Sequence, residues 1–356
     1  MQDGVTRHPW LELRHTLAWA RHAIARRRSA HGDGTQRARS EFYARMWSEA
    51  ADTLGAALVD LGDGFSEVLL GDRTTRLRQD FVMLDDPVTL ALAGNKPLVH
   101  RLLTAAGLPV PPHLAFTLTR IEAAQAFLQQ QAAACVVKPA CNSGAGAGVT
   151  THVATRRQLA RAAVAASIHG PRLLIERHIA GEAYRLLYLH GRLLQAVWRR
   201  PPAVTGDGRS TIRQLVEAEN ARRGAAETTL TRLRLDLDVE LTLRGAGRSL
   251  DTIPAPGESV VVKTVVNDNG RQGNSDVTDG IGPALRAEGA RATAALGTAL
   301  AAVDIITPDP TRPLGEAGGV IVEVNTTPGL HHHHTVGAGR GSVAVTVLKT
   351  LLGVTH

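Results

Sequence analysis

Two short apolar segments near the C-terminal end carry acidic side chains where a buried strand is normally apolar. The first, AVDIITPD (302–309), holds Asp304, and the second, GGVIVEVNTTPG (318–329), holds Glu323 and Asn325. Residues two apart on a strand project from the same face, so Glu323 and Asn325 share a face. The alternative is that Asp304 and Glu323 are surface acids at the ends of their strands, but buried strands rarely carry acids without a partner.

Carboxylate and amide oxygens that converge from adjacent strands are hard ligands of the kind that Mg²⁺ prefers, together with nucleotide phosphates. The sequence therefore predicts a metal site at Asp304, Glu323 and Asn325. No internal repeat accompanies these segments, so a repeat architecture is not indicated.

Lysine is scarce in this chain, and its positions are informative. Only four of the 40 lysine and arginine residues are lysines, at positions 96, 138, 263 and 349. Lysine gives a compact point charge on a flexible stem, whereas arginine gives a rigid planar fork. A retained lysine therefore indicates a site where arginine will not serve. Lys349 lies on a predicted C-terminal helix and is expected to be a surface residue.

A glycine-rich loop follows one of these lysines. Lys138 ends the apolar run ACVVK (134–138), a predicted buried strand, and the loop NSGAGAG spans 142–148. Alternate glycines let successive backbone N–H groups approach an anion. The loop matches neither the P-loop nor the dinucleotide pattern, and by itself it is equally consistent with a structural turn. A strand-borne lysine beside it favours a triphosphate.

The rest of the chain reads as alternating helices and strands. Residues 1–90 are expected to be mostly helical, with a glycine-rich break at 31–35 and short strands near 67–70 and 81–84, and 108–118 reads as an extended linker. Further helices are predicted at 96–107 (capped by Asn95), 156–170, 211–224, 283–301 and 341–353. Strands are predicted at 172–179, 183–200 (with a hairpin turn at 190–191), 303–307 and 319–324.

Composition excludes several classes of protein. Apolar residues make up 44% and charged residues 21% of the chain, which is ordinary for a globular protein. The net charge of +7 fits either an acidic substrate or scattered surface arginine. The arginine-rich run 21–28 has no aromatic residues for base stacking, so no nucleic-acid partner is expected.

The cysteines and the apolar segments indicate a compartment. Cys135 and Cys141 cannot build a disulfide framework, are expected to be small buried thiols, and suit a reducing environment. No signal peptide and no run of about 18 apolar residues is found, so we expect a cytoplasmic protein without a membrane partner.

Four consecutive histidines, His331–His334, follow the NTTPG turn. On an extended chain their side chains would alternate between two faces, which argues against a shared metal site. One of them lining a substrate pocket is the alternative.

Together these blocks resemble the ATP-grasp superfamily, most closely the ATP-grasp region of cyanophycin synthetases. The resemblance covers roughly residues 70–340 and is carried by NKPLVHRLLTAAGLPVP, VVKPACNSGAGAGV, IERHIAGEAYRLLYLHGRLL, VTGDGRSTIRQLV and VDIITPD…GGVIVEVNTTPG. The Mur-ligase-like half of those synthetases, with its separate P-loop, has no counterpart in this sequence.

The resemblance implies an α+β fold in which two α+β subdomains grip ATP. It divides the chain into a helix-rich N-terminal domain (1–90), a small lid subdomain with the glycine loop (91–180) and a large subdomain with the metal site (181–356). Within the last, residues 201–260 read as an insertion or lid.

The implied activity is that of an ATP-dependent carboxylate–amine ligase. A carboxylate would attack the γ-phosphate of ATP, and an amine would displace phosphate from the acyl phosphate to give an amide. ATP and two Mg²⁺ ions are the implied cofactors, and Mn²⁺ is expected to be able to replace Mg²⁺. The implied substrates are amino acids or short peptides. The protein is expected to be a homo-oligomer, with a dimer favoured. Ligation onto a peptide or protein tail is one alternative, and a non-catalytic ATP-binding or nucleic-acid-binding protein is another.

The resemblance also implies roles for individual residues. ATP contacts are expected from Lys96, Lys138, the loop residues Asn142, Ser143, Gly144, Gly146 and Gly148, the adenine hinge residues Glu176, Arg177 and Ile179, and Glu182, which lies one position before the usual ribose acid. A catalytic role is expected for Lys263 near the γ-phosphate. Several ligases carry a catalytic arginine where this chain has Ala302, so Arg185 and Arg271 are expected to take its role. Substrate contacts are expected from Arg185, Asn274, Ser275, Asp276 and Gly329. A plain ion pair of Arg185 with Glu182 or Asp276 is the alternative for that arginine.

Overall fold

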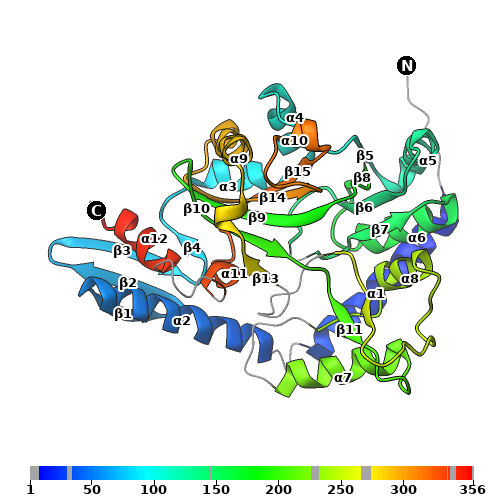
Figure 1. Ribbon diagram of the computed structural model, residues 1–356, viewed down its shortest axis with the longest axis horizontal. Coiled ribbons are helices and arrows are strands. Elements are labelled where there is room, and N and C mark those ends of the chain that lie inside the picture. The colour runs from blue at the N-terminus through cyan, green and yellow to red at the C-terminus, as the bar shows by residue number, and fades with distance from the viewer. Residues whose placement is uncertain are drawn as a thin grey trace.

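Two antiparallel sheets form the frame of the molecule (Figure 1). The computed structural model describes residues 8–29, 34–144, 146–225, 232–265, 274–334, 336 and 342–354. The central sheet has the order β13 (Asn274–Asp276), β10 (Arg192–Arg199), β9 (Glu182–Leu189), β14 (Leu300–Thr307) and β15 (Val320–Thr326). The second sheet has the order β5 (His113–Phe116), β8 (Leu173–Arg177), β6 (Cys135–Pro139) and β7 (Thr150–Val153).

Helices cover both faces of the central sheet. On β9, Leu186 and Tyr188 belong to a core shared with α9 (Pro283–Leu296) and α4 (Lys96–Ala105), beside which α3 (Pro87–Ala93) packs. The alternate residues Leu187 and Leu189 belong to a second core with α2 (Gly34–Leu54) and α12 (Val343–Leu351). Successive side chains of a strand point to opposite faces, so both faces of this sheet are buried.

The N-terminal part contains more strand than the sequence predicts. After α1 (Pro9–Ser29) and α2, a meander runs through β1 (Ala57–Gly62), β2 (Phe65–Leu70), β3 (Arg73–Arg78) and β4 (Phe81–Val82). The strands expected near 67–70 and 81–84 are present. The strands β1 and β3 were not predicted. On β3 the exposed face carries arginine and threonine and only Thr75 and Leu77 are buried, so this strand lacks a long apolar pattern. The helical N-terminal region itself is confirmed.

The second sheet is packed against α5 (Ile121–Gln130), α6 (Arg156–Ser167) and, through Leu11, α1. Thr155 begins α6 with a reciprocal capping box to Gln158, which satisfies backbone N–H groups at the start of the helix. The extended linker predicted at 108–118 is wrong in its second half, because His113–Phe116 pair with β8 as strand β5.

The segment 201–260 is folded around its own small core. It contains β11 (Ala203–Thr205), α7 (Ile212–Ala225), α8 (Leu237–Gly245) and β12 (Ser259–Val261), so a single helix is too few. Apolar residues of these elements form a separate cluster, and Leu241 of α8 also packs into the core of the second sheet. Movement of this segment as a lid stays a prediction, as does the division of the chain into domains.

Several local predictions are confirmed. Asn95 caps α4 by accepting from the backbone N–H of Leu98. The hairpin between β9 and β10 turns at His190 and Gly191, both with positive φ. Between β14 and β15 lies α10 (Leu314–Ala317), and the chain continues through α11 (His331–His334) to α12.

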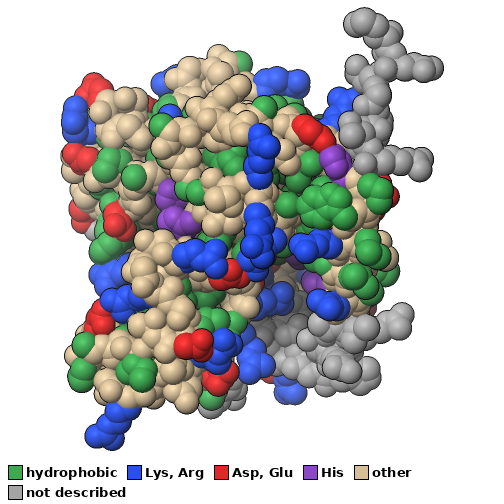
Figure 2. Space-filling model, turned by 90° about the vertical axis from the view of Figure 1, so that its right-hand side faces the viewer, with side chains coloured by type: hydrophobic (Ala, Val, Ile, Leu, Met, Phe, Trp, Pro, Cys, Tyr) green, Lys and Arg blue, Asp and Glu red, His purple; other side chains and the backbone are tan. Residues whose placement is uncertain are grey.

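The α+β class predicted from the sequence is therefore confirmed. In the part of the chain that the structure describes, every helix is too short or too polar to cross a bilayer. Figure 2 shows several lysine and arginine side chains across the middle of one face and others towards its edges, with acidic side chains between them.

Candidate active site

A cavity of about 540 Å³ is lined by residues of both sheets. β6, β7 and β8 contribute one part of its wall, and β9, β14 and β15 contribute another. The glycine loop, α11 and residues of the N-terminal part complete the lining. Segments far apart in the sequence therefore meet around one space.

The three predicted metal ligands lie together on the wall of this cavity. Asp304 and Glu323 are register partners on β14 and β15, and Asn325 pairs with Ala302 two residues further along. Asn325 donates its Nδ2 to Oδ2 of Asp304 at 3.0 Å. Both carboxylates are largely buried, with 19% of the Asp304 and 26% of the Glu323 side chain exposed. These acids thus face the cavity and not the outer surface.

Arg185 holds Asp304 from the neighbouring strand. The two residues are register partners on β9 and β14, and Arg185 donates Nε and Nη2 to the two carboxylate oxygens at 2.7 and 2.6 Å. Burial alone would raise the pKa of Asp304, but the charge and hydrogen bonds of Arg185, with the charge of Arg199, outweigh burial and hold that pKa below its ordinary value. Asp304 is therefore ionised at neutral pH.

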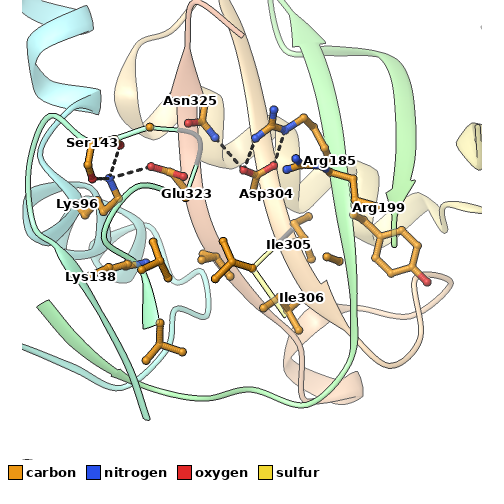
Figure 3. A pocket seen from close by; sticks show the side chains of 18 of the residues that line it. Lys96, Lys138, Ser143, Arg185, Arg199, Asp304, Ile305, Ile306, Glu323 and Asn325 are labelled. Carbon is orange, nitrogen blue, oxygen red and sulfur yellow. Dashed lines mark hydrogen bonds and ion pairs between the residues drawn. The ribbon is translucent and has the colours of Figure 1, made fainter. Parts of the chain in front are cut away.

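Lys96 joins the glycine loop to the second acid. The loop is anchored to the start of α4, because Lys96 donates its backbone N–H to Ala140 and Asn142 donates to Gly94. The Lys96 Nζ then lies 3.0 Å from Oε1 of Glu323 and donates to the carbonyl oxygen of Ser143 at 3.1 Å. Figure 3 shows the two acids between Lys96 and Lys138 on one side and Arg185 and Arg199 on the other.

Lys138 is buried beside Glu176. Its Nζ lies 2.7 Å from Oε2 of Glu176, and both side chains are almost fully enclosed. His100 is buried on the other side of Glu176, and burial, the largest effect, lowers the pKa of His100 to about 4. The lysine is thus held by a carboxylate at the end of β8, where the chain leaves the second sheet.

The sequence and the structure can both be compared with known proteins. The chain is 31% identical over 272 residues to cyanophycin synthetase of Trichormus variabilis, which covers 75% of this chain and 30% of that protein. It is 27% identical over 299 residues to the bifunctional glutathione biosynthesis protein of Mannheimia succiniciproducens, with 82% and 39% covered. The structure of a bifunctional glutathione synthetase from Pasteurella multocida matches with a TM-score of 0.53 and 25% identity, over 84% of this chain and 41% of that one. Over about three quarters of its length the chain is similar to cyanophycin synthetase, and it has the ATP-grasp fold.

No protein-family model matches the sequence. The chain spans about a third of the length of the curated relatives it matches. The fold comparison and the relatives confirm the ATP-grasp fold that was predicted from the sequence.

Most of the predicted ATP-grasp site residues line the cavity. They are Lys96, Lys138, Ser143, Gly144, Gly146, Glu176, Arg177, Ile179, Arg185, Asp304, Glu323, Asn325 and Gly329. Asn142 and Gly148 begin and end the loop without lining the described cavity, and both have positive φ. A Cβ at Gly148 would meet Cδ2 of His169 at 2.6 Å, so only glycine fits there.

Other predicted residues lie away from the cavity. Lys263 is buried and pairs with Asp236, the N-cap of α8, while the next residue, Thr264, lines the cavity. Glu182 accepts a hydrogen bond from Trp198 near the surface. Asn274, Ser275 and Asp276 form β13 beside β10 and do not line the described cavity. Arg271 lies outside the described residues.

The extended conformation predicted for His331–His334 is wrong. These residues form one helical turn, α11, which buries His331, His332 and His333. Tyr43 of α2 and Nδ1 of His331 lie 3.1 Å apart, and Nδ1 of His333 lies 3.0 Å from Oε1 of Gln195. Burial is the main cause that lowers the pKa of His331 and His333 to about 3, so these imidazoles are neutral.

The expectation of small buried thiols holds for Cys135 and only in part for Cys141. Cys135 is buried on β6, Cys141 is half-buried, and neither forms a disulfide. Burial raises the pKa of the Cys135 thiol to about 11, which disfavours the reactive thiolate.

Sequence reasoning missed several side chains that line the cavity. Arg39 and Asp80 come from the N-terminal part, and Arg199 comes from β10. None of them lies in a block with a recognisable spacing. His331 and His332 of α11 also line the cavity, as in the alternative prediction that placed one of the four histidines in a substrate pocket.

The donor set at the acids fits Mg²⁺. Two carboxylates and one amide offer hard oxygen ligands, and Asn325 uses its Nδ2 toward Asp304, which leaves its oxygen for a cation. Each carboxylate is balanced by a neighbouring cation, Asp304 by Arg185 and Glu323 by Lys96. In the described part of the chain, no three His, Cys, Asp or Glu side chains gather as a metal site.

Proposed function

We propose that this chain is an ATP-dependent ligase that joins a carboxylate to an amine through an acyl phosphate. One observation carries the proposal. Asp304, Glu323 and Asn325 line the same cavity as the buried Lys138 and the loop-bound Lys96. The relatives support it, because they are named as cyanophycin synthetase and as bifunctional glutathione biosynthesis protein, and both are synthetic enzymes.

The lysines, the glycine loop, the acids and the hinge have separate roles in the proposed phosphoryl transfer. Lys96 and Lys138 supply fixed positive charge to the phosphates of ATP, and the loop 142–148 offers backbone N–H groups to the same anion. Asp304, Glu323 and Asn325 would hold Mg²⁺, which when bound neutralises charge on the transferred phosphoryl group. The hinge Glu176–Ile179 lines the cavity next to the end of β8, where the adenine base is proposed to lie.

Charge pairs prepare this site for the nucleotide. Lys96 is held by Glu323 and Lys138 by Glu176, so neither lysine has to be drawn from bulk water to meet the phosphates. Preorganised charge of this kind stabilises developing charge without reorganisation at the moment of reaction. We propose that Lys263, which pairs with Asp236 of the 201–260 segment, joins them when that segment closes.

Exclusion of water matters for the second step. The acyl phosphate forms when a carboxylate oxygen bonds to the γ-phosphorus and ADP leaves. The amine then bonds to the acyl carbon, phosphate leaves, and the amine loses a proton. Water would compete with the amine, so closure of the 201–260 segment over the cavity is proposed to protect the intermediate.

Amino acids or short peptides are the proposed substrates. Cytoplasmic location, assembly as a dimer, the use of two Mg²⁺ ions and the replacement of Mg²⁺ by Mn²⁺ stay predictions. The direct test is release of ADP in the presence of MgATP and pairs of amino acids and dipeptides. Amide formation coupled to ADP release is expected for at least one pair. If no pair, and no peptide or protein tail, stimulates ADP release while ATP still binds, the chain is an ATP-binding protein without ligase activity.

A further inference from the structure

An ion pair from the N-terminal part of the chain forms part of the cavity wall. Arg39 of α2 donates Nη2 to Oδ2 of Asp80 at 2.8 Å, and both residues line the cavity that holds Asp304. The Asp80 side chain is only 10% exposed, so this is not an ordinary surface pair. No ATP-contacting role was assigned to either residue.

A hairpin turn held by α2 presents Asp80 to the cavity. Asp80 is the second residue of the two-residue turn between β3 and β4, and Gln79 before it has a φ of +54°, which is uncommon for a residue other than glycine. Two side chains of α2 hold this turn. Trp47 donates Nε1 to the carbonyl oxygen of Gln79 at 2.8 Å, and the Gln79 side chain donates to Ser40 at 2.8 Å. A positive φ is usual in a two-residue hairpin turn, and the two contacts with α2 fix the position of this turn.

The helix that carries Arg39 is fixed to the active-site sheet. Arg39 and Tyr43 are one turn apart on α2, and the Tyr43 hydroxyl is hydrogen-bonded to Nδ1 of the buried His331. The core beneath α2 contains Leu187 and Ala302, which share the sheet face of Arg185 and Asp304. The position of Arg39 relative to the acids is therefore set by packing and not by a loose tail.

Arg39 has hydrogen-bonding capacity that the protein does not use. Its Nε is buried and has no hydrogen-bond partner among the described residues, whereas the guanidinium of Arg185 is committed to both oxygens of Asp304. A guanidinium with spare donors is suited to a carboxylate, which it can bind through two parallel hydrogen bonds. His332, also in the wall, has a buried Nδ1 without a hydrogen-bond partner among the described residues, and its imidazole is neutral because burial lowers its pKa.

These observations lead to a substrate class. An amino acid that reacts through its amine keeps its own carboxylate through the whole reaction, and that carboxylate needs a cation other than those at the phosphates. We propose that Arg39 binds the unreacted carboxylate of the amino acid whose amine attacks the acyl phosphate, with Asp80 orienting the guanidinium and His332 available to the amine. This inference rests on the ligase function proposed above, and it assigns a specificity role to the N-terminal part of the chain.

The test compares amino acids with their amides, which lack the carboxylate. The melting temperature of the whole protein with MgADP is measured with each of the twenty L-amino acids and with the amide of each that binds. We expect at least one amino acid to raise the melting temperature and its amide to fail. The variant Arg39→Gln should lose the response, and Arg39→Lys should keep part of it. Arg45→Gln removes the same charge from the exposed side of α2 and should behave as the wild type.

A kinetic comparison separates binding from folding. With the amino-acid pair that releases ADP, Arg39→Gln should raise the KM for the amine substrate about tenfold or more and leave the KM for MgATP within about twofold, because a charge-assisted hydrogen bond is lost only to that substrate. The inference is overturned if acid and amide act equally on the wild type, if Arg39→Gln still distinguishes them, or if no amino acid binds. Binding that depends on Arg39 without any ADP release would instead refute the ligase function and keep the binding site.

Discussion

Arg185 and Asp304 lie opposite each other on β9 and β14 and are joined by two hydrogen bonds of 2.7 and 2.6 Å. The sequence led us to expect Arg185 to bind a substrate carboxylate. In the structure its guanidinium instead holds the first proposed metal ligand in the ionised state. A substrate role for Arg185 stays a prediction, and the structure adds a second role that can be measured.

Replacement of Arg185 by alanine should change the pH dependence of turnover. Without the guanidinium, burial is no longer offset and the pKa of Asp304 rises, by roughly 1–3 units for a carboxylate that loses such a neighbour. Because the ionised carboxylate is the required form, activity should be lost at higher pH than in the wild type. The pH profile of kcat/KM for MgATP measures this. Arg192→Ala, at the exposed start of β10, should leave the profile unchanged, and an unmoved acid limb in Arg185→Ala would refute the role.

Lys138→Arg should damage ATP binding nearly as much as Lys138→Ala. The lysine is buried against Glu176 at 2.7 Å, and a rigid planar guanidinium cannot take the place of a point charge there. We expect both variants to lower kcat/KM for MgATP by at least about tenfold, the cost of one or more charge-assisted hydrogen bonds. Lys349→Arg on α12 is the matched control and should be neutral. Normal ATP binding by Lys138→Arg would show that lysine is not specifically required.

The stability of the fold should fall in mildly acidic solution. Burial lowers the pKa of His100 to about 4, whereas an unfolded histidine titrates near 6.5. Between these values the unfolded chain binds a proton that the folded chain does not, so stability falls as the pH falls from about 6.5 towards 4. At pH 5 the loss should be about 2 kcal/mol for His100. His331 and His333 act in the same direction.

Urea unfolding at pH 7 and pH 5 measures this loss. His100→Asn should show a smaller decrease between the two pH values than the wild type, and the exposed His190→Asn should show the same decrease as the wild type. An unchanged decrease in His100→Asn would mean that this residue does not carry the acid sensitivity.

Gly181, between the hinge and β9, should be intolerant of a side chain. Its φ is +143°, and a Cβ there would lie 2.7 Å from the carbonyl carbon of Thr307. Gly170 has a similar φ of +157° but open space around it. Gly181→Ala should therefore cost roughly 1–3 kcal/mol more than Gly170→Ala, as expected for overpacking against backbone. Equal free energies of unfolding for the two variants would contradict the close contact.

Much of the fold could be predicted from local patterns. The β14–β15 pair, the hairpin at His190 and Gly191 and the Asn95 cap all depend on residues close in sequence, and each was found. The acids were also found, because an acid inside an apolar strand is conspicuous against its neighbours.

The rest depends on contacts that no local pattern encodes. Arg39 and Asp80 are 41 positions apart and reach the cavity only because α2 packs on the central sheet. β3 is mostly polar because one of its faces is exposed, so it resembled a loop. His331 and His333 of the histidine turn α11 contact Tyr43 and Gln195, and these partners come from distant elements.

Glu323 provides the most direct test of the central claim, that this cavity binds ATP through a metal held by Asp304, Glu323 and Asn325. The measurement is the initial rate of ADP formation as a function of Mg²⁺ concentration for the wild type, for Glu323→Gln and for Glu316→Gln, which removes the same charge from an exposed position on α10. We predict no ADP without a divalent cation, a rate at least about a hundredfold lower in Glu323→Gln because metal stabilisation is worth several kcal/mol, and a normal rate in Glu316→Gln. A Glu323→Gln protein that forms ADP at nearly the wild-type rate, with the same dependence on Mg²⁺, would contradict the account.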